Sequence, residues 1–115
     1  MRKTTQLVAA AAMTMPLLAS PLRAAADVVL DWNAIAVAAT ATTQNPFIQA
    51  RLLAITQLAV VEAVNGTAPR YEPYLGSTIA PPGASAEAPA VAAAHGVLKH
   101  YLPGSAATLD AARVA

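Results

Sequence analysis

Apolar residues recur at helical spacing in the segment that starts at Trp32. They follow at i, i+3, i+4 and i+7, the spacing of one helix face: Trp32, Ile35, Ala36 and Ala39. Asp31, directly before them, is predicted to be the N-cap, because a carboxylate can accept hydrogen bonds from the free amides of the first turn. This first helix is expected to fade between Thr40 and Thr43.

The second predicted helix has the clearest boundaries in the chain. Asn45 is a good N-cap, and Pro46 suits the first helical position because its missing N–H would be unpaired there. The helix is expected to run from Pro46 to about Val64. It is expected to end at Asn65-Gly66, where the glycine supplies the left-handed residue of a C-cap.

This second helix is apolar almost all round. Its apolar residues cover more than one face: Phe47, Ile48, Leu52, Leu53, Ile55, Leu58, Val60, Val61 and Val64. Such a helix is either buried by neighbours on several sides or spans a membrane. Four polar residues argue against a membrane: Gln49, Arg51, Gln57 and Glu62. We therefore expect the central helix of a bundle larger than this chain can build.

Proline and glycine residues forbid regular structure from Thr67 to Ala84. Four large apolar residues recur along this loop and are expected to anchor it across a protein surface: Tyr71, Tyr74, Leu75 and Ile79. Two more helices follow. Ser85 is predicted to cap a third helix that reaches about Tyr101, and Ser105 to cap a fourth that begins at Ala106 and has no C-cap after it.

The composition agrees with an all-α fold that has a thin core. Hydrophobic residues make up 57% of the chain, but 31 residues are alanine, which forms helices well and adds little area to a core. Cysteine is absent, which excludes disulfides, thiolate metal sites and Cys nucleophiles. The net charge of +1 offers no basic surface for nucleic acid.

The first 26 residues have the layout of a secretory signal peptide. Arg2 and Lys3 precede an apolar stretch from Leu7 to Ala19, and a small-residue run ends at Ala26, where we predict cleavage. The apolar stretch is shorter than the roughly 20 residues that a membrane span needs. The protein is therefore expected to be exported, to the periplasm or outside a bacterial cell. Residues 27–115 carry four cations and six anions, a charge of −2, which argues further against nucleic-acid and anionic-membrane partners.

Candidate chemistry in the sequence is sparse. His95 and His100 are five residues apart, about 140° around a helix, so they cannot share one metal. His95 is expected to be a hydrogen-bonded core residue and His100 to face solvent. Arg51 and Glu62 lie roughly 16 Å apart along the second helix, so each is expected to pair with a polar group on another helix. The cationic residues lie on separate segments, and no histidine is expected beside a group of them. We therefore predict no catalytic, cofactor-binding or metal-binding residue.

Several short strings, in order and at matching spacing, carry a family resemblance. They are Asp31-Trp32-Asn33-Ala34-Ile35, Glu62-Ala63-Val64-Asn65, Pro69-Arg70-Tyr71-Glu72-Pro73-Tyr74, Pro82-Gly83-Ala84-Ser85, Leu102-Pro103 and Thr108-Leu109-Asp110, with His95 in an Ala-rich helix. Together they resemble the N-terminal region of bacterial exported vanadium-dependent haloperoxidase-like proteins, of the type 2 phosphatidic acid phosphatase superfamily. Two positions depart from the pattern: Pro89 lies inside the third helix, and Glu62 stands where Asp is expected.

The resemblance implies a scaffold and not a catalytic site. The family's site needs a Lys followed by Arg-Pro, then Ser-Gly-His, then an Arg and a His, which together hold vanadate or phosphate. Here Lys99 is followed by no Arg-Pro, His95 follows three alanines, and Arg113 has no His after it. Residues 27–115 are thus expected to be the N-terminal helical part of a larger bundle, truncated and inactive without its C-terminal half. Haloperoxidase and phosphatase activity, and hence a vanadate cofactor in the full-length family, both stay open.

The sequence also fits a second interpretation. The chain could be a free-standing small helical exported protein that binds a partner through its apolar second helix.

Overall fold

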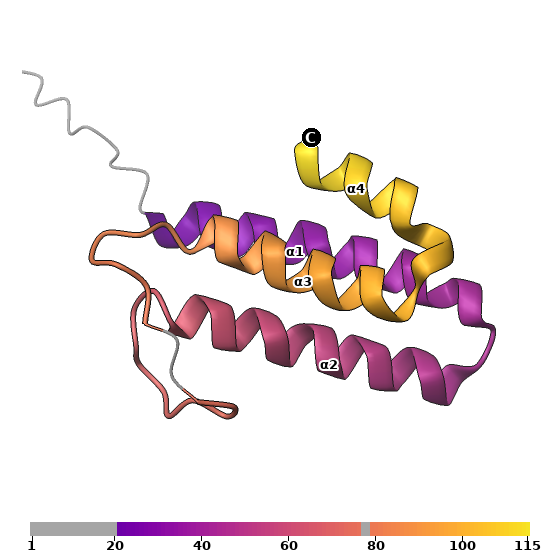
Figure 1. Cartoon of the computed structure of the whole chain (residues 1–115), viewed down its shortest axis with the longest axis horizontal. Coiled ribbons are helices and arrows are strands. Elements are labelled where there is room, and N and C mark those ends of the chain that lie inside the picture. The colour runs from indigo at the N-terminus through magenta and orange to yellow at the C-terminus, as the bar shows by residue number, and fades with distance from the viewer. Residues whose placement is uncertain (1–20, 77–78) are drawn as a thin grey trace, which may run out of the picture.

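The computed structural model describes residues 21–76 and 79–115, and these form helices without strands (Figure 1). The elements are α1 (Pro21–Thr40), the 3-10 turn η1 (Ala41–Thr43), α2 (Pro46–Asn65), α3 (Glu87–Tyr101), the 3-10 turn η2 (Pro103–Ser105) and α4 (Ala106–Val114). The all-α prediction is thereby confirmed over the described part of the chain. The long irregular segment between α2 and α3 is the predicted loop.

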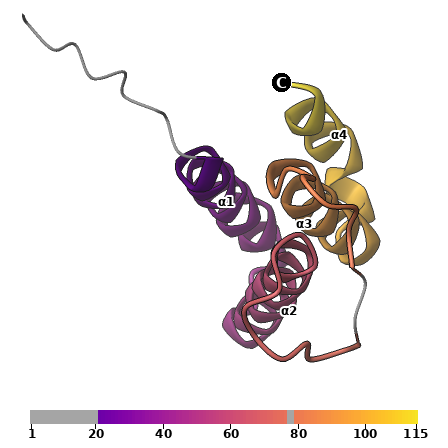
Figure 2. The ribbon, with the colours of Figure 1, turned by 90° about the vertical axis from the view of Figure 1, so that its left-hand side faces the viewer.

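Helices α1, α2 and α3 pack against one another, and α4 packs on α3 (Figures 1 and 2). The core is small, as the composition predicts, because four of the ten buried apolar residues among the described side chains are alanines. Its members are Trp32, Ala36, Ala39, Leu52, Val60, Ala90, Ala94, Leu98, Leu102 and Leu109. Two buried threonines, Thr40 and Thr56, donate their hydroxyls to the carbonyls of Ala36 and Leu52, so neither leaves an unpaired polar atom in the core.

Helix α1 begins earlier than the sequence pattern predicts. The expected face is confirmed, since Trp32, Ala36 and Ala39 are buried. The prediction that Asp31 is the N-cap is wrong, because the helix already starts at Pro21 and Asp31 lies exposed within it. The alanine run before Asp27 is a strong helix former and extends the helix upstream. Residues 1–20 of the predicted signal peptide lie outside the described residues, and the predicted cleavage site falls inside α1.

The start of α2 is confirmed and its end needs a correction. The Asn45 side chain accepts hydrogen bonds from the N–H groups of Phe47 (3.0 Å) and Ile48 (3.3 Å), with Pro46 at the first helical position. The helix ends at Asn65 as expected, but Gly66 has φ −63° and is not left-handed. The Thr67 N–H and hydroxyl both donate to the Val64 carbonyl, which closes the helix end without a left-handed residue.

The two predicted serine caps differ from expectation in detail. Ser85 lies one residue outside the N-cap of α3, and its hydroxyl accepts from the N–H of Glu87 at 3.2 Å. Ser105 is the N-cap residue of α4, as predicted, but its side chain makes no capping hydrogen bond. Pro89 is the third residue of α3, in the first turn, where its missing N–H costs no helical hydrogen bond.

Helix α2 is buried on one side only. Among the described residues its buried members are Leu52, Thr56 and Val60, while Phe47 is 86% and Val61 52% exposed. The prediction of burial on several sides is therefore not met within this chain. By length and composition alone, with a mean hydropathy of 1.5, α2 could also cross a membrane.

Candidate functional site

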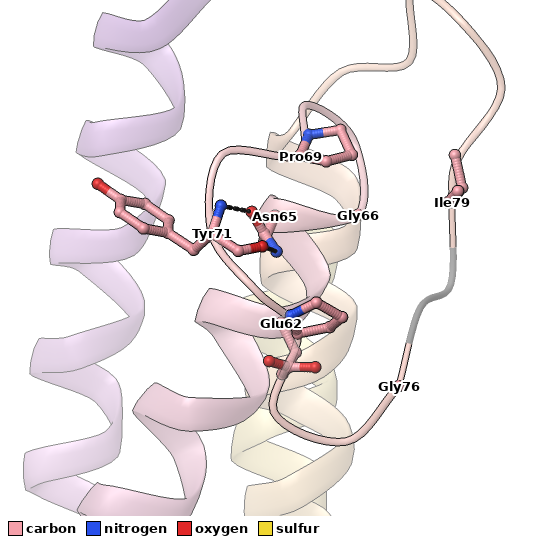
Figure 3. Close-up of a pocket in the computed structure, with 8 residues that line it drawn as sticks. Glu62, Asn65, Gly66, Pro69, Tyr71, Gly76 and Ile79 are labelled. Atoms are coloured by element: carbon pink, nitrogen blue, oxygen red, sulfur yellow. Dashed lines mark hydrogen bonds between the residues drawn. The ribbon is translucent and has the colours of Figure 1, made fainter.

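The Asn65 side chain ties the loop to the end of α2. Its Oδ1 accepts from the N–H groups of Arg70 (2.9 Å) and Tyr71 (3.1 Å), and its Nδ2 donates to the Tyr71 carbonyl (2.8 Å) (Figure 3). Both the oxygen and the nitrogen of the side-chain amide thus bind the same short segment of the loop. Its position as the last helical residue leaves it free of helical packing, so it can turn toward the chain that follows.

Glu62 makes a second attachment, one turn earlier on α2. Its two carboxylate oxygens accept from the N–H groups of Tyr74 (2.7 Å) and Leu75 (3.3 Å). The prediction that Glu62 pairs with another helix is wrong, because backbone amides of its own loop satisfy it instead. Arg51 is exposed, and no ion pair among the described residues involves it. We call the Glu62 and Asn65 attachments the loop clamp.

The clamp holds the backbone of the loop while its large side chains face solvent. The four predicted anchors are between 72% and 77% exposed: Tyr71, Tyr74, Leu75 and Ile79. The prediction that they anchor the loop across a surface is therefore wrong for the surface this chain provides. Figure 3 shows the Tyr71 ring pointing away from Glu62 and Asn65. Polar contacts, and not apolar burial, fix the course of this segment.

The space beneath the clamp does not suit a cofactor. One hollow, lined in part by Glu62, Asn65, Pro69 and Tyr71, holds about 80 Å³ (Figure 3), well below the roughly 300 Å³ of a small ligand site. A second, open hollow of about 490 Å³ is lined mostly by apolar and backbone groups of α2, the loop and the start of α3. Its charged residue is Glu62, whose oxygens already bind the loop amides. Neither hollow offers converging polar groups for a substrate.

Replacing Asn65 with alanine is expected to free the loop without unfolding the helices. The change removes three hydrogen bonds, each worth about 1 kcal/mol at most in this exposed setting. Trypsin should therefore cleave after Arg70 roughly tenfold faster, because local opening precedes cleavage. Asn33→Ala, which removes only the 2.7 Å hydrogen bond from Gln57 to Asn33, should leave that rate unchanged. Equal cleavage rates in both variants and the parent would contradict the clamp.

A polar cluster joins α3 to α4. The His95 Nε2 lies 2.7 Å from Asp110 Oδ1, and Lys99 Nζ donates to both Asp110 oxygens at 2.8 Å. Arg113 Nη1 lies 3.4 Å from His95 Nδ1. The prediction that no imidazole lies among cations is wrong, because α4 folds back on α3 and brings Arg113 and Asp110 to His95. We call these four residues the α3–α4 cluster.

Within the α3–α4 cluster, His95 is a structural group. It is buried, as predicted, and the Trp32 ring meets it edge-on with 6.1 Å between ring centres. In a neutral ring, Nε2 donates to Asp110 and Nδ1 accepts from Arg113, so neither nitrogen is free to accept a proton from a substrate. His100 is exposed, and its ring meets the Tyr101 ring edge-on. Over the described ranges no three His, Asp or Glu side chains gather as a metal site.

Acid is expected to loosen α4 from α3. The hydrogen bonds from Lys99 and His95 lower the pKa of Asp110 below its usual value. A carboxyl whose folded-state pKa is lowered stabilises the fold fully above the unfolded pKa of about 3.9, and this stabilisation is lost as the pH falls through the lower folded-state value. NMR shifts of residues 106–114 should therefore titrate below about pH 4. Asp110→Asn should lack this titration, and the same titration in that variant would contradict the assignment.

Comparison of the chain with protein-family models, with curated proteins and with solved structures found no match. The site must therefore be interpreted from its own geometry. Sequence reasoning missed both the loop clamp and the α3–α4 cluster. One signal for the cluster was present: His95 and Lys99 are four residues apart, so they lie on the same helix face and can share one carboxylate.

Proposed function

We infer that this chain is the N-terminal helical scaffold of an exported enzyme of the vanadium-dependent haloperoxidase-like or acid-phosphatase-like type. It contributes helices that position a catalytic half and binds no oxyanion by itself. Its partner is the C-terminal helical half of the same domain, and vanadate or phosphate chemistry belongs to that half.

One observation carries the proposal: the strings that resemble the family meet one another in the fold. Trp32 of the first string contacts His95, and His95 binds Asp110 of the last string. Glu62 and Asn65 of the second string bind the loop that contains the third. Residues that are far apart in the chain thus serve as joints between its helices, which is the role expected of a scaffold segment.

The arrangement of α4 and α1 supports the same proposal. In both views the end of α4 lies on the side of the bundle away from α2 (Figures 1 and 2). Val114 of α4 is 86% exposed, and α1 exposes Leu30 (66%) and Val37 (50%). Apolar groups of this size are stabilised when further helices cover them. Helices that follow α4 are therefore proposed to pack on these faces.

The α3–α4 cluster explains why the chain alone is proposed to lack activity. An oxyanion site needs cations and amide donors that are free to bind the anion. Here the Asp110 carboxylate is bound by Lys99 Nζ and by the His95 ring, and its negative charge offsets one of the two cationic charges in the cluster. The remaining cation of the cluster, Arg113, points to His95 Nδ1.

The purified chain is expected to show no vanadate-dependent bromination in the presence of peroxide and no phosphomonoester hydrolysis. The assay compares the chain with a heat-treated sample and with Lys99→Ala. Bromination above the heat-treated sample that is lost in Lys99→Ala would contradict the proposal and make the α3–α4 cluster an oxyanion site.

A second candidate function is a free-standing exported protein that binds a partner through α2. The observation in its favour is the exposure of Phe47 (86%) and Ile48 (45%) at the start of that helix. The two candidates differ in what the gene encodes after residue 115.

A further inference from the structure

Apolar side chains line the outward face of α2 between Phe47 and Val61. At about 100° per residue, four residues lie opposite the buried Leu52, Thr56 and Val60. We call them the outer stripe: Phe47, Ala54, Leu58 and Val61. Phe47, Ala54 and Val61 are seven residues apart, which is the repeat of a helix that packs lengthwise on another helix. From Phe47 to Val61 this stripe is about 21 Å long, at 1.5 Å per residue.

Two opposite charges beside the outer stripe, Arg51 and Glu62, lie at equal distances from a point near the centre of α2. Arg51 and Glu62 lie on the same flank of α2, about 20° apart around the axis, and the midpoint between them falls between Thr56 and Gln57. That midpoint is close to the centre of α2. If a second α2 runs antiparallel about a two-fold axis through this point, Arg51 faces Glu62 of the partner subunit, and the contact occurs twice.

We propose that α2 pairs antiparallel with α2 of a second copy of this chain, with the outer stripes in contact and Arg51 bound to Glu62 of the partner subunit. The opposite charges set the register, because any shift of the two helices separates both pairs. Glu62 can accept this contact while it holds the loop, since a carboxylate has about four acceptor positions and two are used by the loop amides.

The loop clamp fits this surface. By fixing the backbone at Tyr74 and Leu75, Glu62 places two side chains that are 73% and 77% exposed beside the C-terminal half of α2. Preorganised apolar groups lose less entropy on association than mobile ones. A membrane is the less suitable occupant, because Arg51 and Glu62 flank the stripe and would be costly to bury in lipid.

Sedimentation of the purified chain should give a species of twice the 11.7 kDa chain mass. Val61→Glu should lower dimer affinity at least a hundredfold. Val37→Glu is the matched control, because Val37 on α1 is 50% exposed against 52% for Val61, and it should leave the dimer intact. Retained helical circular dichroism in both variants excludes unfolding as the cause. A monomeric parent chain, or equal dissociation by both variants, would overturn the proposal.

The register is tested by charge reversal. Arg51→Glu alone and Glu62→Arg alone should each weaken the dimer at least tenfold, because each places two like-charge pairs in contact. An equimolar mixture should recover a heterodimer, in which both contacts again join opposite charges. Mixtures that stay monomeric while both variants remain helical would refute the Arg51–Glu62 contact.

Disulfide trapping tests the orientation, since the chain has no native cysteine. Ala54→Cys mixed with Leu58→Cys should oxidise to a mixed disulfide faster than Ala54→Cys oxidises with itself. Faster self-linking of Ala54→Cys would indicate parallel or unspecific association and would reject the proposal. Cosedimentation with phosphatidylcholine vesicles that dissolves the dimer would reject it in favour of a membrane.

Discussion

Replacing Trp32 with alanine is expected to abolish cooperative unfolding of the bundle. Trp32 is 5% exposed and is the largest of the ten buried apolar residues in the part of the chain that the structure describes, four of which are alanines. Removing a buried Trp costs about 3–5 kcal/mol, which is comparable with the whole stability of a small domain. Neighbouring alanines are too short to fill the space that the indole leaves.

The measurement is thermal unfolding followed by far-ultraviolet circular dichroism. Trp32→Ala should lose its sigmoidal transition, whereas Trp32→Phe should keep one at a lower temperature. Tyr74→Ala is the control, because that aromatic ring is 73% exposed and its loss should leave the transition in place. A transition in Trp32→Ala within a few degrees of the parent would mean that Trp32 is not the centre of the core.

Replacing Leu109 with alanine is expected to release α4 and leave the other three helices folded. Leu109 is 1% exposed and is the buried residue of α4, which packs on α3 and the η2 turn. A buried Leu→Ala change costs about 2–5 kcal/mol, more than the exposed Asp110 contacts can offset. Local release needs less free energy than global unfolding, so the effect should be confined to α4.

Amide hydrogen exchange separates local release from global unfolding. In Leu109→Ala, residues 106–114 should lose most of their protection while α1, α2 and α3 keep theirs. Leu75→Ala makes the same chemical change at a leucine that is 77% exposed and should alter neither region. A uniform loss of protection over all four helices would show that α4 is an integral part of the bundle.

Local signals allowed most of the helical framework to be predicted. Asn45-Pro46 marks a helix start by chemistry that needs no tertiary contact, and the structure places the start there. The spacing of Trp32, Ala36 and Ala39 is also a local signal, because residues at this spacing lie on one helix face. The structure buries that face. The prediction that Asp31 is an N-cap failed because an N-cap residue must follow non-helical chain. Here the alanine run before Asp31 is itself helical.

The candidate sites depend on chain reversals that the sequence pattern does not specify. Asp110 reaches His95 and Lys99 only after the η2 turn folds α4 back on α3. Glu62 is bound by backbone amides of the loop, whereas its position on an apolar helix predicted a polar partner on another helix. The exposure of Tyr71 and Tyr74 also could not be predicted. The apolar character of a residue shows that it favours burial, but it does not show which part of the molecule covers it.

The proposed function makes the described helices one part of a larger exported domain. The joints at His95 and Asn65 would then hold the scaffold in shape, while the exposed faces of α1 and α4 receive the helices that carry the oxyanion site. The α2 pairing is independent of this proposal and concerns the opposite side of the bundle.

Sequencing the coding DNA beyond codon 115 tests whether the described helices belong to a larger enzyme. We expect an open reading frame that continues in phase and encodes a Lys followed by Arg-Pro, then Ser-Gly-His, then an Arg and a His, within further amphipathic helices. A stop codon directly after Ala115, or a continuing frame without these motifs, would contradict it and leave the free-standing helical binding protein as the better description.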